Sequence, residues 1–166
     1  MTVIRTLTAA ECELVHAVFG DGVDTARVRI YGGVWWLPEN GAAFSVGGRI
    51  YFPRAHYRDD FAQESPAMQH WFIHEMTHVW QSQQGFPVLV AGVWLCLRGG
   101  YWRRRGYRYA RHCTLGGFAR MNMEQQADAV ADYFMDIRLY GQSRLEATLC
   151  EFLRRPHGKA VLPRFW

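Results

Sequence analysis

Apolar residues recur along most of this chain every three or four positions, which predicts amphipathic helices. Polar cap residues stand before these stripes, and glycine or proline follows them. Four helices are expected on these signals, over Thr8–Gly20, Ser65–Gly85, Asn122–Gly141 and Ser143–Pro156. The first and last are predicted to open with capping boxes. The second would be about 30 Å long, enough to run through a whole domain.

A period of two is confined to the first third of the chain and predicts strands. Residues 27–31 alternate polar and apolar positions, and residues 34–37 form a second candidate strand. Two β-rich runs, 42–46 and 49–52, flank Gly47-Gly48, which is typical of a tight hairpin. A group of strands followed by long helices predicts an α+β fold.

The composition is that of one globular domain. Of the 166 residues, 49% are apolar and 15% aromatic, which excludes a disordered chain and permits a real core. The net charge of +4 is mild and comes almost entirely from arginine. The cysteines show no CxxC pairing, which argues against a cysteine zinc site and a disulfide framework and fits a reducing compartment. We predict a single domain over residues 1–166.

No targeting or membrane-spanning segment is visible in the sequence. The N-terminus lacks a charged region followed by an apolar core, so no signal peptide is expected. The longest apolar run, Phe86–Leu97, is too short for a transmembrane helix, which needs about 20 residues. The expected location is cytoplasmic, with export without a cleaved signal as the open alternative.

Residues 86–114 are predicted to be an insertion rich in arginine and aromatic side chains. The insertion contains Arg98, Arg103, Arg104, Arg105, Arg108 and Arg111, interleaved with Tyr101, Trp102, Tyr107 and Tyr109. We expect a lid of mixed structure, in which a buried helix or strand is favoured over an amphipathic element that touches a membrane. Nucleic acid is a weaker alternative partner, since basic loops are more often solvated flaps or sites for acidic peptides.

The run Ile73–Gln81 places His-Glu-x-x-His inside the second predicted helix. Residues four apart share one helix face, so His74 and His78 can both reach one divalent cation. Glu75 lies about 100° further round, where its carboxylate can take a proton from an activated water. A chain with seven histidines also yields this pattern by chance, so the motif alone does not decide the chemistry.

A later helix carries Glu124 and Asp128 four residues apart on an alanine-lined face. A metal held by two histidines needs a third protein ligand that leaves one position open for water, and Glu124 can be that ligand. Asp128 can accept the other ring N–H of a ligand histidine and so orient it. Asp132, one turn further along, is expected to lie beyond reach of the metal. The alternative is a solvated acidic helix with no ligand role.

His74-Glu75-x-x-His78 followed by Glu-x-x-Ala-Asp at 124–128 resembles the gluzincin zinc metallopeptidases. The resemblance implies a zinc ion bound by His74, His78 and Glu124, with Glu75 as the general base. It also implies a minimal zincin-like fold, in which a small mixed sheet with an edge hairpin packs on the two ligand-bearing helices.

Residues 43–52 together with 73–81 look like the compact metallopeptidase-like domain found with bacterial contractile injection systems, in proteins described as Vgr-related or Rhs-associated. The match covers roughly residues 10–85, and the acidic helix extends it to about residue 140. Many such domains end soon after the His-Glu-x-x-His helix, whereas this chain continues to the motif at 124–128, which offers a third metal ligand. The 45 residues between His78 and Glu124 exceed the spacer of the smallest gluzincins and are expected to place the basic segment over the site.

The resemblance also implies a place for the substrate. In gluzincins the strand before the metal helix is often an exposed edge that pairs with extended substrate, a role that falls here on Arg49–Phe52 or its hairpin partner. An ordinary core hairpin is the open alternative. Peptide hydrolysis also needs a donor for the developing oxyanion. The candidates, which the sequence does not rank, are Tyr107, Tyr109, Arg111, His112 and Arg120.

The favoured function is zinc-dependent peptide-bond hydrolysis by a metalloendopeptidase, with peptide or protein substrates. The resemblance adds a link to a bacterial secretion or injection system, whose proteins are expected partners. One alternative is a non-catalytic, zinc-containing component of an injection apparatus, which the intact Glu75 disfavours. The other is nucleic-acid binding through residues 98–111.

Overall fold

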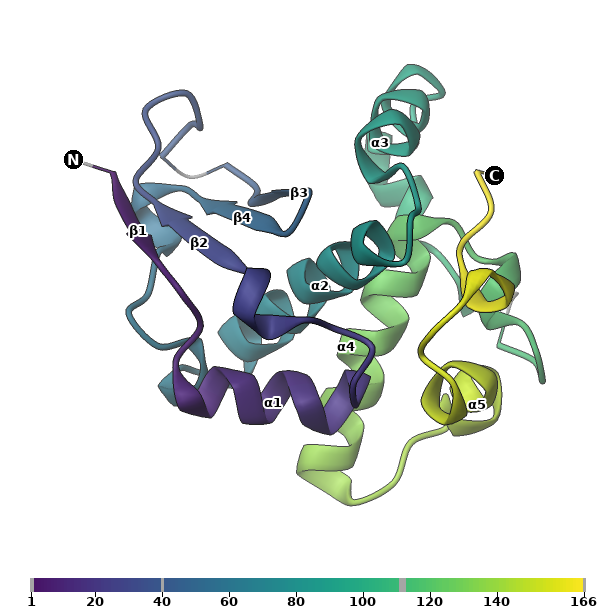
Figure 1. The fold of residues 1–166 in the computed structure, drawn as a ribbon. Coiled ribbons are helices and arrows are strands. Elements are labelled where there is room, and N and C mark those ends of the chain that lie inside the picture. The colour runs from purple at the N-terminus through teal and green to yellow at the C-terminus, as the bar shows by residue number, and fades with distance from the viewer. Residues whose placement is uncertain (1, 40, 111–112, 166) are drawn as a thin grey trace.

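A small mixed sheet forms one side of the molecule (Figure 1). The computed structural model describes residues 2–39, 41–110 and 113–165. The strands are β1 (Val3–Arg5), β2 (Arg29–Gly32), β3 (Phe44–Val46) and β4 (Arg49–Phe52), in the order β1-β2-β4-β3. The central pair β2–β4 is parallel and the two outer pairs are antiparallel.

Within the described residues, five α-helices surround and extend this sheet. They are α1 (Ala9–Phe19), α2 (Pro66–Gln83), α3 (Val88–Leu97), α4 (Met123–Tyr140) and α5 (Glu146–Arg154). Figure 1 shows α2 running through the middle of the molecule, with the sheet on one side and α4 on the other. The predicted α+β fold with a mixed sheet is therefore confirmed.

The long helices begin where their cap residues predicted. Thr8 Oγ1 accepts from the Glu11 N–H, and the Glu11 carboxylate accepts from the Thr8 N–H, so α1 opens with the expected capping box. Asn122 and Gln125 form the same reciprocal pair at the start of α4. Gly141 ends α4 in the left-handed conformation, with φ of 70°.

The interior is built where α2 crosses α4. Every residue from Phe72 to Gln81 is buried, so this part of α2 has no face in water. Its partners on α4 include Ala127 and Ala131, both fully buried, and small side chains let two helix backbones approach closely. A polar side chain on this stretch of α2 must therefore find a partner inside the protein.

Two predicted features are wrong. Residues 34–37 form a turn closed by a hydrogen bond from Leu37 N–H to Val34 O, because β2 already has β1 and β4 on its two sides. The aromatic pair in that run therefore has no strand to join. The capping box predicted at Ser143 does not form either. Its hydroxyl donates to Asp136 at 2.7 Å, and α5 begins three residues later.

The insertion has the mixed structure expected, but its helix is not buried. α3 and a 3₁₀ turn over Trp102–Tyr107 make up most of it. Only Val88, Ala91 and Leu95 of α3 are buried, and the first two pack with Phe86. The other large side chains of α3 are exposed because nothing among the described residues covers that side of the helix.

Candidate metal centre

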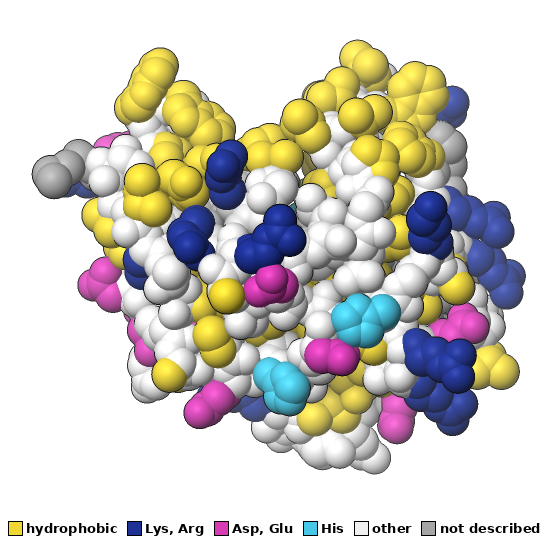
Figure 2. Space-filling model, viewed as in Figure 1, with side chains coloured by type: hydrophobic (Ala, Val, Ile, Leu, Met, Phe, Trp, Pro, Cys, Tyr) yellow, Lys and Arg dark blue, Asp and Glu magenta, His cyan; other side chains and the backbone are white. Residues whose placement is uncertain are grey.

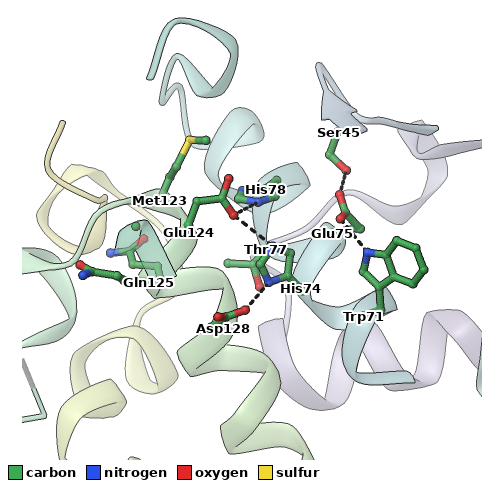
Figure 3. Close-up of polar contacts among 12 residues, drawn as sticks. Ser45, Trp71, His74, Glu75, Thr77, His78, Met123, Glu124, Gln125 and Asp128 are labelled. Carbon is green, nitrogen blue, oxygen red and sulfur yellow. Dashed lines mark hydrogen bonds and ion pairs between the residues drawn. The ribbon is translucent and has the colours of Figure 1, made fainter. Parts of the chain in front are cut away.

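Three side chains predicted as metal ligands converge between α2 and α4 (Figure 3). Glu124 Oε2 lies 3.3 Å from His74 Nε2 and 3.4 Å from His78 Nε2. The three potential ligand atoms lie within 4.8 Å of one another, and all three residues are buried. Two imidazole nitrogens and one carboxylate oxygen are the donor set of catalytic zinc sites, which leaves a fourth position open. The residues present therefore fit a zinc ion.

A hydrogen bond orients each histidine from behind. The Nδ1–H of His74 donates to Asp128 Oδ1 at 2.8 Å, as the spacing on α4 predicted. The Nδ1–H of His78 donates to Gln81 Oε1 at 2.9 Å. Because these bonds keep a proton on Nδ1 of both rings, a metal ion would take the place of the proton on Nε2.

Gln81 was not predicted from the sequence, although it stands one turn after His78 on the same helix face. Its amide is itself fixed, because Nε2 donates to Met123 O and to Gln126 Oε1, both at 3.1 Å. Gln126 in turn donates to Phe118 O and Val161 O. Both glutamines are fully buried, so this chain of amides sets the position of His78 rigidly.

The centre is electrostatically prepared for a cation. Burial lowers the pKa of His74, but its hydrogen bonds with Asp128 and Glu124 outweigh that effect and raise the pKa to about 10. Burial likewise raises the pKa of Glu124, yet the two histidines hold it well below its usual range. A buried carboxylate thus stays ionised beside imidazoles that favour positive charge. A metal ion would replace the imidazole protons as the source of that charge.

Glu75 lies beside the three candidate ligands and is held by two donors (Figure 3). Its Oε2 accepts from Ser45 Oγ at 2.6 Å, and its Oε1 accepts from Trp71 Nε1 at 3.1 Å. Two donors, one on each oxygen, fix the orientation of the carboxylate. Trp71 could have been found from its position four residues earlier on the helix. Ser45 could not, because only the folded sheet brings β3 to α2.

A tyrosine of the insertion reaches the centre. Tyr101 donates its hydroxyl to Glu124 Oε1 at 2.9 Å, a contact that the sequence did not predict. The ring of Tyr107, one of the predicted oxyanion donors, lies 6.2 Å from the His74 ring. Burial and the charge of Glu124 raise the pKa of both phenols above the ordinary value, so both stay protonated.

The other predicted oxyanion donors are not placed at the centre. Tyr109 donates its hydroxyl to Asp132 instead. Arg120 is exposed and does not line the cavity described below. Arg111 and His112 lie outside the described residues.

A cavity of about 760 Å³ lies over the centre, between β3 and α3. Ala42, Ala43, Phe44 and Ser45 line one side, and Val88, Leu89, Gly92, Val93 and Cys96 line the other. His74, Glu75, His78, Glu124, Tyr101 and Tyr107 also line it. The candidate ligands and the candidate base therefore face one space large enough for a peptide segment.

The edge of the sheet at this cavity is β3. Arg49–Phe52 was one of two candidates for the edge, but β4 pairs with β2 on one side and β3 on the other, so it has no free side. The hairpin partner takes the outer position instead. The middle residue of this edge strand, Ser45, is the one that contacts Glu75.

Asp132 lies outside the ligand cluster, as its position one turn beyond Asp128 predicted. It is nevertheless engaged, because Oδ1 accepts from His70 Nε2 at 2.8 Å and Oδ2 accepts from Tyr109. His70 lines the cavity, so Asp132 supports the cavity wall rather than the candidate ligands.

We predict that Asp128→Ala weakens zinc affinity by about 10–100-fold, because His74 loses the acceptor that fixes its ring. Gln81→Ala should cost about as much through His78. Asp132→Ala is the matched control, because it removes a carboxylate from the next turn of α4 that contacts none of the candidate ligands. The zinc affinity of this variant should change little. Competition with a chromogenic chelator ranks the three variants. If Asp132→Ala lowered zinc affinity more than Asp128→Ala, Asp128 would not be the residue that orients His74.

These observations define a class of protein, an α+β domain with a candidate metal centre between two central helices. No model of a known protein family matches the sequence. The chain is 34% identical over 154 residues to the type VI secretion system spike protein VgrG2b of Pseudomonas aeruginosa, a match that covers 90% of this chain and 15% of that protein. The chain therefore spans a small part of the length of this relative.

The structural comparison is with the effector domain of the same relative. The solved effector domain of Pseudomonas aeruginosa VgrG2b superposes with a TM-score of 0.69 and 34% identity, covering 89% of this chain and 81% of that domain. The chain belongs to the family of that effector domain. This relationship supports the predicted association with injection systems, whereas the gluzincin assignment stays a prediction.

Proposed function

We propose that this chain is a zinc-dependent metalloendopeptidase that serves as an effector domain of a bacterial injection system. The observation that carries the proposal is the convergence of His74, His78 and Glu124 on one point, with Glu75 beside them in the same cavity. A purely structural zinc site closes all four positions with protein ligands, whereas this set supplies three and adds a carboxylate that is not needed as a ligand.

A zinc ion bound there would supply a Lewis acid that activates water and polarises the scissile carbonyl. Glu75 accepts a proton from the attacking water, whose oxygen forms a bond to the carbonyl carbon. As the C–N bond breaks, Glu75 passes that proton to the leaving amine. Ser45 and Trp71 hold the Glu75 carboxylate in place for both transfers. Among the described residues predicted as oxyanion donors, Tyr107 is the one that lines the cavity, so we assign it that role.

The edge strand supports the proposed substrate class. β3 is the outer strand of the sheet, and an extended peptide can pair with the free side of such a strand. A peptide bound along β3 would lie over Ser45 and Glu75, with its side chains in the cavity between β3 and α3. This arrangement favours an unfolded segment of a protein over a small polar substrate.

The link to an injection system rests on similarity. The relative is a type VI secretion system spike protein, and its solved domain is an effector domain. We propose that this chain is likewise carried by an injection apparatus, with other proteins of that apparatus as partners. The nucleic-acid alternative is less favoured, because none of the described arginines lines the cavity that holds the candidate centre.

Metal analysis combined with a digestion assay tests this function. Protein purified without added metal should contain close to one zinc per chain, and it should cleave peptides of a proteome-derived library. A chelator should stop the cleavage, and added zinc should restore it. Stoichiometric zinc without cleavage would favour the non-catalytic component, and protein that binds no zinc would refute the metal site itself.

A further inference from the structure

Two exposed apolar projections stand on either side of the cavity. Figure 2 shows them at the top of the molecule, with a hollow between. The first, the tryptophan loop, is made of Trp35, Trp36 and Phe44. The second, the α3 rim, is made of Leu89, Val90, Val93, Trp94, Leu97 and Trp102. Trp35 is 91% exposed, Leu97 76% and Trp102 69%, so the outermost side chains of both projections are almost entirely in water.

The α3 rim is unusual for a helix in water. α3 contains no charged residue, and its sequence is apolar on every face. An amphipathic helix would present polar groups on the side that faces solvent, and a helix that is apolar all round is normally covered on all sides. Only one side of α3 is covered here, by contacts within the domain. The exposed side of α3 is therefore suited to contact with an apolar partner outside the domain.

The tryptophan loop is anchored so that its tip points outward. The Trp36 ring packs on Tyr51 at 5.4 Å and on Phe44 at 6.1 Å, which ties the loop to the sheet. Trp35 is left on the surface, where its side chain adds nothing to the packing of the core. Large exposed apolar groups that gather beside a cavity mark an interaction surface.

The stretch of sequence that carries the α3 rim has charged residues of one sign. Between Glu75 and Glu124 the sequence contains seven arginines and no aspartate or glutamate. Arg98 follows α3 directly and stacks on Trp94, with 5.1 Å from its guanidinium carbon to the ring centre. Arg105 and Arg108, in the segment after the rim, are exposed. An apolar tip backed by arginine is complementary to a layer of acyl chains beneath anionic headgroups.

We propose that the tryptophan loop and the α3 rim dock this chain on the surface of an anionic lipid bilayer, with the cavity facing the membrane. Tryptophan favours the headgroup level of a bilayer, and arginine reaches phosphate groups from there. α3 has ten residues and is about 15 Å long, half the thickness of the hydrocarbon core, so it lies in the interface. A second copy of the chain is a poor occupant, because it would bring arginine against arginine. The proposal does not depend on the metal centre.

Flotation of the 166-residue chain with lipid vesicles tests this docking. Vesicles that contain phosphatidylglycerol should carry the protein upward, with a partition coefficient at least about tenfold higher than vesicles of phosphatidylcholine alone. Trp35→Ser and Leu97→Ser, one in each projection, should each lower binding by about tenfold. Both side chains are so exposed that neither change should unfold the protein, which a thermal melt verifies. Leu139→Ser is the matched control, since Leu139 is 54% exposed near the far end of α4.

Four results would overturn the proposal. The first is that the wild-type chain does not float with either kind of vesicle. The second is that it binds neutral and anionic vesicles equally. The third is that the Leu139→Ser control loses as much vesicle binding as Trp35→Ser and Leu97→Ser. The fourth is that the wild type does not float but sediments as a dimer, which Trp35→Ser and Leu97→Ser disrupt. The two projections would then pair two copies of the chain.

Discussion

Glu75→Gln is expected to eliminate peptide hydrolysis while zinc and the fold are retained. An amide cannot accept the proton of the attacking water, so kcat/KM should fall by at least about 10³-fold. The substitution also preserves the local hydrogen bonds. The new amide oxygen can accept from Trp71, which only donates, and the new NH₂ group can donate to the hydroxyl oxygen of Ser45.

The control for this variant is Glu64→Gln, the same chemical change just before α2. Glu64 pairs with Arg58 at 3.4 Å and does not line the cavity, so its replacement should leave hydrolysis unchanged. Elemental analysis and a quenched-fluorescence peptide assay on both variants give the comparison. Undiminished hydrolysis by the Glu75 variant would rule out its role as the general base.

Loss of one ligand is expected to abolish stoichiometric zinc. His78→Ala removes a nitrogen donor, and Glu124→Ala removes the only anionic one, so each should weaken zinc affinity by at least about 10³-fold. The effect should exceed that of Asp128→Ala, because a direct bond is lost rather than the orientation of a ligand. Glu124→Ala also leaves the Tyr101 hydroxyl without its acceptor, so the insertion should loosen over the cavity.

His70→Ala is the matched control, because His70 is a third histidine of α2 that lines the same cavity. It is bonded to Asp132 rather than to the cluster, so zinc content should stay near one per chain. Inductively coupled plasma analysis after dialysis against a weak chelator measures all three variants. If zinc persisted in the His78 variant, His78 would not be a ligand.

The supports behind the two histidines differ in kind. Asp128 is a charged acceptor for His74, whereas Gln81 is a neutral acceptor for His78. A carboxylate makes the imidazole more basic and holds it more strongly, while an amide chiefly fixes its direction. The candidate centre therefore combines one strongly polarised histidine with a second histidine whose position is fixed by the buried amides of Gln81 and Gln126.

Much of the candidate centre follows from local helix geometry, which the sequence carries by itself. The spacing of His74 and His78 places both rings on one face wherever α2 lies, and the spacing of Glu124 and Asp128 does the same on α4. The starts of α1 and α4 are equally local, because a cap residue and the residue three positions later satisfy each other's backbone N–H groups. These features need no knowledge of the rest of the chain.

The tertiary structure decided the contacts between residues distant in sequence. Ser45 reaches Glu75 across 30 positions, and Tyr101 reaches Glu124 across 23, so no periodicity could reveal either bond. The edge of the sheet depended on strand order, which makes β3 the outer strand and leaves residues 34–37 without a partner. The exposure of α3 had the same origin. Its apolar sequence is compatible with full burial, and only the arrangement of neighbouring helices determines which side remains in solvent.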